Sequence, residues 1–130
     1  MSSEIIAEDM LKSSGSESDS IVSVLISNYP LSNGGYLVSF GRDESDGSFK
    51  NFDPVLSSDY VGSWLSKRLD FNPLFLPAGC FYLPDSGLGA FIESLALGAS
   101  YFQMKLLPAS SQLQGLILVK VNESSLFEYE

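Results

Sequence analysis

Short runs of β-type residues separated by turn residues are the feature that most constrains the fold of this chain. Residues 21–27 are rich in β-branched side chains, and residues 36–40 alternate apolar and polar side chains more cleanly. Between these runs lies SNGG at 32–35, where Asn and Gly accept the positive φ of a hairpin turn. Residues 42–47 form a second polar turn before a third run at 48–52. The sequence therefore predicts a three-stranded antiparallel meander.

Residues 58–69 carry the clearest helical pattern, and Asn72-Pro73 prevents its continuation. Four apolar residues fall on one stripe of this predicted central helix: Val61, Trp64, Leu65 and Leu69. A second, shorter helix is predicted at 3–12, where acids come early and a lysine comes late, as the helix dipole favours. The Ser-rich segment at 13–20 then has the composition of a linker.

Residues 79–98 fit two different structures. As a hairpin, the apolar runs 80–83 and 88–92 are strands joined by the turn PDSG. As a helix, the segment is capped at Asp85 or Ser86 and ends at Gly98. Its apolar face then consists of Leu88, Phe91, Ile92 and Leu95. Two glycines near the start weaken such a helix by roughly 1 kcal/mol each, so we favour the hairpin and leave the helix open.

Long strands are predicted at 101–107 and 113–121, and a short one at 126–129. The fold class is therefore a β-rich α+β protein, with about seven to eight strands in an antiparallel sandwich or partly open barrel. It carries one central amphipathic helix and a short N-terminal helix. We expect residues 1–20 to form an N-terminal arm and residues 21–130 to form a single globular domain.

Charge and residue usage exclude several classes of function. Asp and Glu number 16 against 7 Lys and Arg, which gives a net charge of -9. Seven cations are too few for an interface with duplex nucleic acid. Histidine is absent, so Ser-His and Cys-His catalysis and His-ligated metals are excluded. The single cysteine, Cys80, lies in an apolar run and is expected to be a small buried hydrophobe. We expect no metal site and no nucleic-acid partner.

No motif for catalysis or cofactor binding is present. Gly87-Leu88-Gly89 lacks the lysine and the further glycine of a phosphate loop. Lys105 and Lys120 alternate with apolar neighbours, as outward-facing strand residues do. We therefore expect a protein that is not an enzyme and holds no cofactor. The sequence starts without the pattern of a signal peptide and has no membrane-spanning run, so we expect it to be made in the cytoplasm.

Two hypotheses of function remain. Only 18% of residues are charged while 12% are aromatic, and interface cores are depleted of charge. The first hypothesis is a structural subunit of a multi-copy assembly, such as a decoration, cement or tail component of a virus particle. The alternative is an acidic cytosolic binding protein, such as an inhibitor, immunity protein or secretion chaperone, that docks on a basic partner. The residues proposed for protein contacts are Ile5, Ile6, Met10, Leu11, Tyr29, Phe71 and Phe127.

Overall fold

The computed structural model describes residues 9–13, 20–28, 34–43, 48–53, 74–75, 80–110 and 115–126. These residues form a strand-rich fold with one main helix, α2 (Leu88–Leu97). The strands are β1 (Asp9–Ser13), β2 (Ile21–Asn28), β3 (Tyr36–Asp43), β4 (Phe49–Asn51), β5 (Leu74–Phe75), β6 (Cys80–Leu83), β7 (Tyr101–Leu106) and β8 (Ile117–Asn122). Two short 3-10 helices, η2 (Asp85–Gly87) and η3 (Glu123–Leu126), follow β6 and β8.

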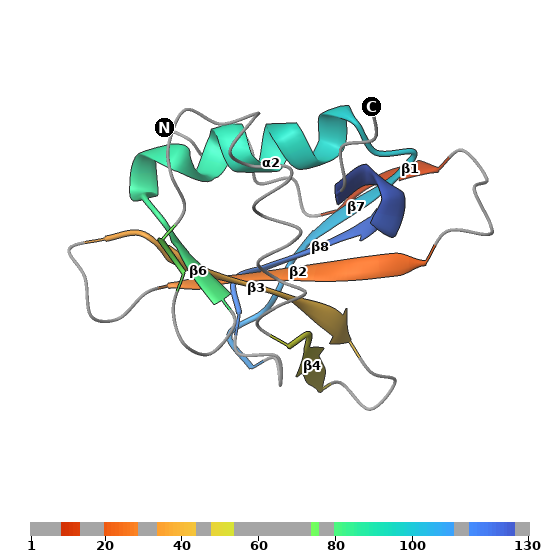
Figure 1. Cartoon of the computed structure of the whole chain (residues 1–130). Helices are drawn as coiled ribbons and strands as arrows, with labels where there is room; N and C mark the ends of the chain where they lie inside the picture. The colour runs from red at the N-terminus through yellow and green to blue at the C-terminus, as the bar shows by residue number, and fades with distance from the viewer. Residues whose placement is uncertain are drawn as a thin grey trace.

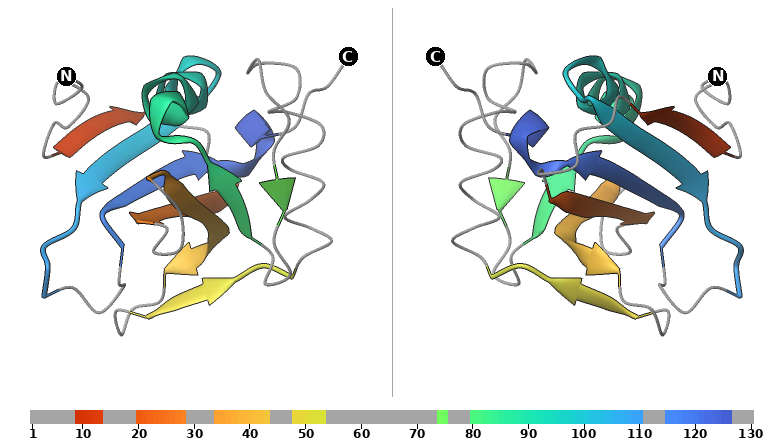
Figure 2. Two further views of the ribbon diagram at one scale, coloured as in Figure 1. Left: turned by 90° about the vertical axis from the view of Figure 1, so that its left-hand side faces the viewer. Right: turned by 90° about the vertical axis from the view of Figure 1, so that its right-hand side faces the viewer.

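All described strands belong to one sheet with the order β1-β7-β8-β2-β3-β6-β5, and β4 also pairs with β3. Every pairing is antiparallel. The predicted β-rich α+β class is confirmed, and the sheet is open rather than part of a sandwich or a barrel. Figure 2 shows α2 at the top of the view and β4 (yellow) at the bottom.

Strand alternation gives the sheet one apolar face. In β2, Val22, Val24 and Ile26 are all fully buried. Val24 lies opposite Phe40 of β3 and Val119 of β8, which are also buried. Because directly paired residues point to the same side, this register carries the apolar face across the three central strands.

Helix α2 covers the apolar face (Figure 1). Its buried residues are Leu88, Phe91, Ile92 and Leu95. The ring of Phe81 on β6 joins the helix to the sheet, since its centroid lies 5.8 Å from Phe91 and 6.0 Å from Phe40. The core therefore sits between α2 and the central strands.

The favoured hairpin at 79–98 is correct for its first strand, 80–83, which is β6, and wrong for its second, because residues 88–97 form the alternative helix. This helix ends at Gly98 as predicted, but its N-cap is Gly87 rather than Asp85 or Ser86. Gly87 is the N-cap of α2, a position where glycine costs little, so only Gly89 lies inside the helix near its start. Burying four large apolar side chains gains roughly 1.5–3 kcal/mol each, which outweighs about 1 kcal/mol for one glycine. The predicted PDSG turn is the short 3-10 helix η2 rather than a hairpin loop. A 2.9 Å hydrogen bond from Gly87 N to Pro84 O closes it.

The N-terminal helix predicted at 3–12 is wrong where the structure describes it. Residues 9–13 are β1, which pairs with β7 from Asp9 opposite Lys105 to Ser13 opposite Tyr101. An isolated ten-residue helix is marginal in water, whereas a strand here supplies partners for the backbone groups of β7. Residues 9–13 of the predicted arm therefore belong to the sheet.

The predicted strands at 21–27, 36–40 and 48–52 correspond to β2, β3 and β4, and those at 101–107 and 113–121 to β7 and β8. The predicted hairpin glycines Gly34 and Gly35 have φ of 125° and 105°. A Cβ on Gly35 would lie 2.5 Å from the Tyr82 hydroxyl, so glycine is needed there for close approach as well. The predicted central helix at 58–69, with Trp64, lies outside the described residues. So does all of the predicted strand at 126–129 except Leu126, which ends η3.

Candidate functional site

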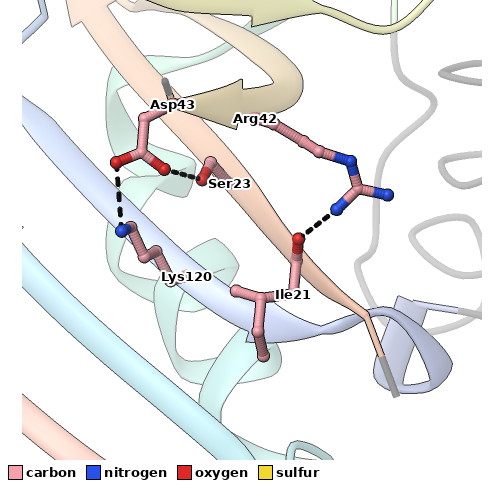
Figure 3. Close-up of polar contacts among 5 residues, drawn as sticks. All are labelled: Ile21, Ser23, Arg42, Asp43 and Lys120. Atoms are coloured by element: carbon pink, nitrogen blue, oxygen red, sulfur yellow. Dashed lines mark hydrogen bonds and ion pairs between the residues drawn. The ribbon is translucent and has the colours of Figure 1, made fainter. Parts of the chain in front are cut away.

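Polar side chains gather where β3 ends, beside its neighbours β2 and β4 and one strand away from β8. Arg42 and Asp43 are consecutive residues at the end of β3, and consecutive side chains of a strand point to opposite faces. Figure 3 shows their side chains directed away from one another, each toward a different group on the neighbouring strands. This end of the sheet therefore has one polar cluster on each face.

Asp43 links three strands on the face opposite α2. Its Oδ1 accepts a 2.8 Å hydrogen bond from Ser23 Oγ, and its Oδ2 lies 3.0 Å from Lys120 Nζ (Figure 3). Ser23 of β2 lies opposite Gly41 of β3 and Lys120 of β8, so the register brings these residues to one face. The network joins β2, β3 and β8 beyond their main-chain hydrogen bonds.

The surroundings of Asp43 set its protonation. Partial burial alone would raise its pKa, but hydrogen bonds from Lys120 and Ser23, together with the charge of Lys120, lower the pKa below its ordinary value. The carboxylate is therefore held in its charged form. Ser23 is only 2% exposed and its hydroxyl donates its proton to Asp43, which suits a structural contact rather than a nucleophile.

Arg42 lies on the other side of the strand. Its Nη1 donates a hydrogen bond to the carbonyl oxygen of Ile21, beyond the last main-chain pair of β2 and β3 (Figure 3). The guanidinium carbon also lies 5.2 Å from the centre of the Phe52 ring, within cation–π distance. Two contacts therefore hold the guanidinium in one place at the sheet end.

A solvent-open pocket of about 280 Å³ lies beside this guanidinium. Its lining residues are Arg42, Lys50, Asn51 and Phe52. Lys50 of β4 lies directly opposite Arg42 of β3, so the register of two strands places two cations at one pocket. The sequence predicts a turn at Arg42 and a strand at Lys50 but not the register between them, so it does not reveal this site.

Gly41 allows β4 to reach this position. A Cβ on Gly41 would overlap the main-chain carbonyl oxygen of Lys50 and lie 2.9 Å from the carbonyl carbon. The close approach of β4 also permits a 2.9 Å hydrogen bond from Phe52 N to Phe40 O. The glycine therefore positions both Lys50 and Phe52 against β3.

β1 forms one end of the sheet. Within the described ranges, no strand pairs with its outer edge. It is also longer than β4 and β5, the other strands with one partner each, which have three and two residues. Of the residues proposed for protein contacts, Met10 and Leu11 lie on this edge strand rather than on a helix. The other five proposed contact residues lie outside the described residues: Ile5, Ile6, Tyr29, Phe71 and Phe127.

Asn122 is a buried polar residue with a structural role. Its Oδ1 accepts hydrogen bonds from the main-chain N–H groups of Ser100 and Tyr101, both at 3.0 Å, and its Nδ2 donates to Ser124 Oγ at 2.9 Å. The residue is 3% exposed and ties the end of β8 to the turn between α2 and β7. The two main-chain donors lie 22 and 21 residues away along the chain, so no local sequence pattern indicates this role of Asn122.

The buried thiol of Cys80 agrees with its prediction as a small hydrophobe. Burial raises the pKa of this thiol, so the reactive thiolate is disfavoured. In the described part of the chain, no cluster of three or more Cys, Asp or Glu side chains is placed to hold a metal ion. No described helix has the length and apolar character needed to cross a bilayer.

Comparisons with protein-family models, with curated proteins and with solved structures find no match to this chain.

Proposed function

We propose that this protein is a non-enzymatic structural subunit of a multi-copy assembly, of the kind that decorates, cements or forms the tail of a virus particle. The observation that carries the proposal is the outer edge of β1, which ends the described sheet without a paired strand. An open edge presents main-chain donors and acceptors that can bind a strand of another chain. The occupant we assign to this edge is β1 of a second copy.

The sequence of β1 favours one register for such a pair. Antiparallel pairing about a two-fold axis at Leu11 uses all five residues and places the two Leu11 residues opposite each other. Asp9 then lies opposite Ser13 of the second copy, and Lys12 lies opposite Met10. Centring the pair on Asp9 or on Lys12 would instead place like charges opposite each other, which destabilises a strand pair.

The net charge gives this association a recognisable salt dependence. Two copies that each carry a charge of -9 repel at long range, and added salt screens that repulsion. Self-association should therefore strengthen as salt rises. A complex between this acidic chain and a basic partner, the alternative function, should weaken instead.

Sedimentation equilibrium of the full chain tests the proposal, with two variants of equal charge change. Leu11→Lys places two lysines opposite each other at the two-fold axis, while within one copy position 11 pairs with the polar Gln103 in the strand register. We expect this variant to be monomeric where the wild type is dimeric. The matched control Ser13→Lys places each lysine opposite Asp9 of the second copy, and it should retain or strengthen the dimer.

The outcomes separate the interface from the function. A wild-type chain that stays monomeric at high concentration and high salt contradicts the assembly proposal as a whole. Oligomers that form equally well with Leu11→Lys would keep the assembly but contradict the β1 interface. A monomer that forms a salt-sensitive complex with a basic protein supports the alternative of an acidic binding protein.

A further inference from the structure

The pocket at the end of β3 brings together two of the few cations of this chain. The whole sequence has 7 Lys and Arg among 130 residues, yet Arg42 and Lys50 line the same pocket. In the part of the chain that the structure describes, no carboxylate forms an ion pair with either of them. Among the described residues that line it, this pocket therefore carries two positive charges and no negative one.

The two cations are also directly opposite each other in the β3–β4 pair. Like charges at directly opposed positions destabilise a strand pair, and here no intervening acid offsets that cost among the described residues. An anion bound between Arg42 and Lys50 would remove the repulsion. The arrangement thus gains stability from a ligand of the opposite charge.

The donors match an oxyanion. Arg42 uses Nη1 for the Ile21 carbonyl, which leaves its remaining N–H groups for a ligand. Its guanidinium is held over Phe52, so little conformational freedom is lost on binding. The Lys50 ammonium adds a mobile point charge, and the exposed Asn51 amide adds a neutral donor.

We propose that the pocket formed by Arg42, Lys50, Asn51 and Phe52 binds the phosphate group of a small phosphate monoester. The pocket volume of about 280 Å³ exceeds the space that a bare phosphate needs, which favours a phosphate attached to a small organic group. This site is independent of the β1 edge, since β1 and β4 lie at separate places in the sheet.

Isothermal titration calorimetry on the full chain tests this site with adenosine monophosphate, adenosine and inorganic phosphate as probes. We expect adenosine monophosphate to bind, adenosine not to bind, and inorganic phosphate to displace the monophosphate. Lys50→Gln should weaken binding about tenfold, because one charge-assisted contact of ~1.4 kcal/mol is lost. Lys50 is exposed, so this variant should fold normally.

The matched control is Lys105→Gln, which removes the same charge from an exposed lysine on β7, away from the pocket. This variant should bind adenosine monophosphate as the wild type does. Equal weakening by both variants would show a general charge effect and overturn the proposed site. Adenosine binding as tightly as its monophosphate, or no binding of the monophosphate at millimolar concentration, would overturn it as well.

Discussion

Lys120 Nζ lies 3.0 Å from Asp43 Oδ2, in an ion pair that joins β8 to β3 across the intervening strand β2. Ser23 of β2 completes the link with its 2.8 Å hydrogen bond to the other carboxylate oxygen. Both partners of the ion pair are largely shielded from solvent, with side-chain exposures of 29% for Lys120 and 26% for Asp43. One carboxylate thus holds the ends of three strands together.

Asp43→Asn should destabilise the protein by about 1–3 kcal/mol, because two hydrogen bonds to a charged acceptor are weakened. Urea unfolding at neutral pH measures the change. Glu93→Gln, the same change of acid to amide at an exposed residue of α2, is the control and should change the free energy of unfolding by less. Equal effects of the two substitutions would contradict the role assigned to the network.

The same network predicts a pH dependence. The pKa of Asp43 is lower in the folded chain than in the unfolded chain, where the pKa of Asp is about 3.9. The folded state therefore binds fewer protons than the unfolded state in this window, and the stability from Asp43 is fully present above the unfolded pKa. It is lost as pH falls through the lower folded pKa. The difference in unfolding free energy between wild type and Asp43→Asn should shrink below about pH 4, and a difference that stays constant to pH 2 would contradict this assignment.

Gly41→Ala should destabilise the protein by about 1–3 kcal/mol, in the range of other overpacked sites. The added methyl group collides with the main chain of Lys50, which cannot move without shifting β4. Chemical denaturation measures the loss. Because Lys50 and Phe52 line the pocket, the variant should also bind adenosine monophosphate more weakly. Unchanged stability would contradict the close approach of β4 to Gly41.

Much of the sheet follows from local sequence, whereas the errors arise from contacts between distant segments. The β-branched runs of β2 and β8 and the glycines before β3 identify strands and a turn by themselves. The strand β1 forms only because β7 offers it an edge, which no local pattern reveals. The sequence disfavours helix α2 only when Gly87 is placed inside the helix, whereas that residue is the N-cap.

The contacts in the candidate sites are harder to predict from the sequence than the strands are. Arg42 and Lys50 become neighbours only through the β3–β4 register. Asp43 of β3 forms its ion pair with Lys120 of β8 across the intervening strand β2. Adjacent residues such as Arg42 and Asp43 instead diverge to opposite faces. Side chains that act together here are brought together by strand order, which composition and spacing do not determine.

Asn122→Ala should cost about 2–4 kcal/mol, because the main-chain N–H groups of Ser100 and Tyr101 lose their acceptor in a partly buried turn. Thermal unfolding measures the effect. Asn28→Ala is the matched control, since Asn28 is exposed at the end of β2 and the same atoms are removed. A similar loss for both variants would argue against a special role for the buried amide.

Gly89→Ala should stabilise the protein by about 0.5–1 kcal/mol, the opposite sign to Gly41→Ala. Gly89 is the second residue of α2, and a Cβ built there meets no atom within 4 Å. The methyl group therefore costs nothing in packing, while alanine restricts the unfolded chain and favours the helix. Urea unfolding of the two alanine variants side by side measures the contrast. A destabilising effect of Gly89→Ala would contradict the position of Gly89 in the exposed first turn of α2. It would support the hairpin alternative instead.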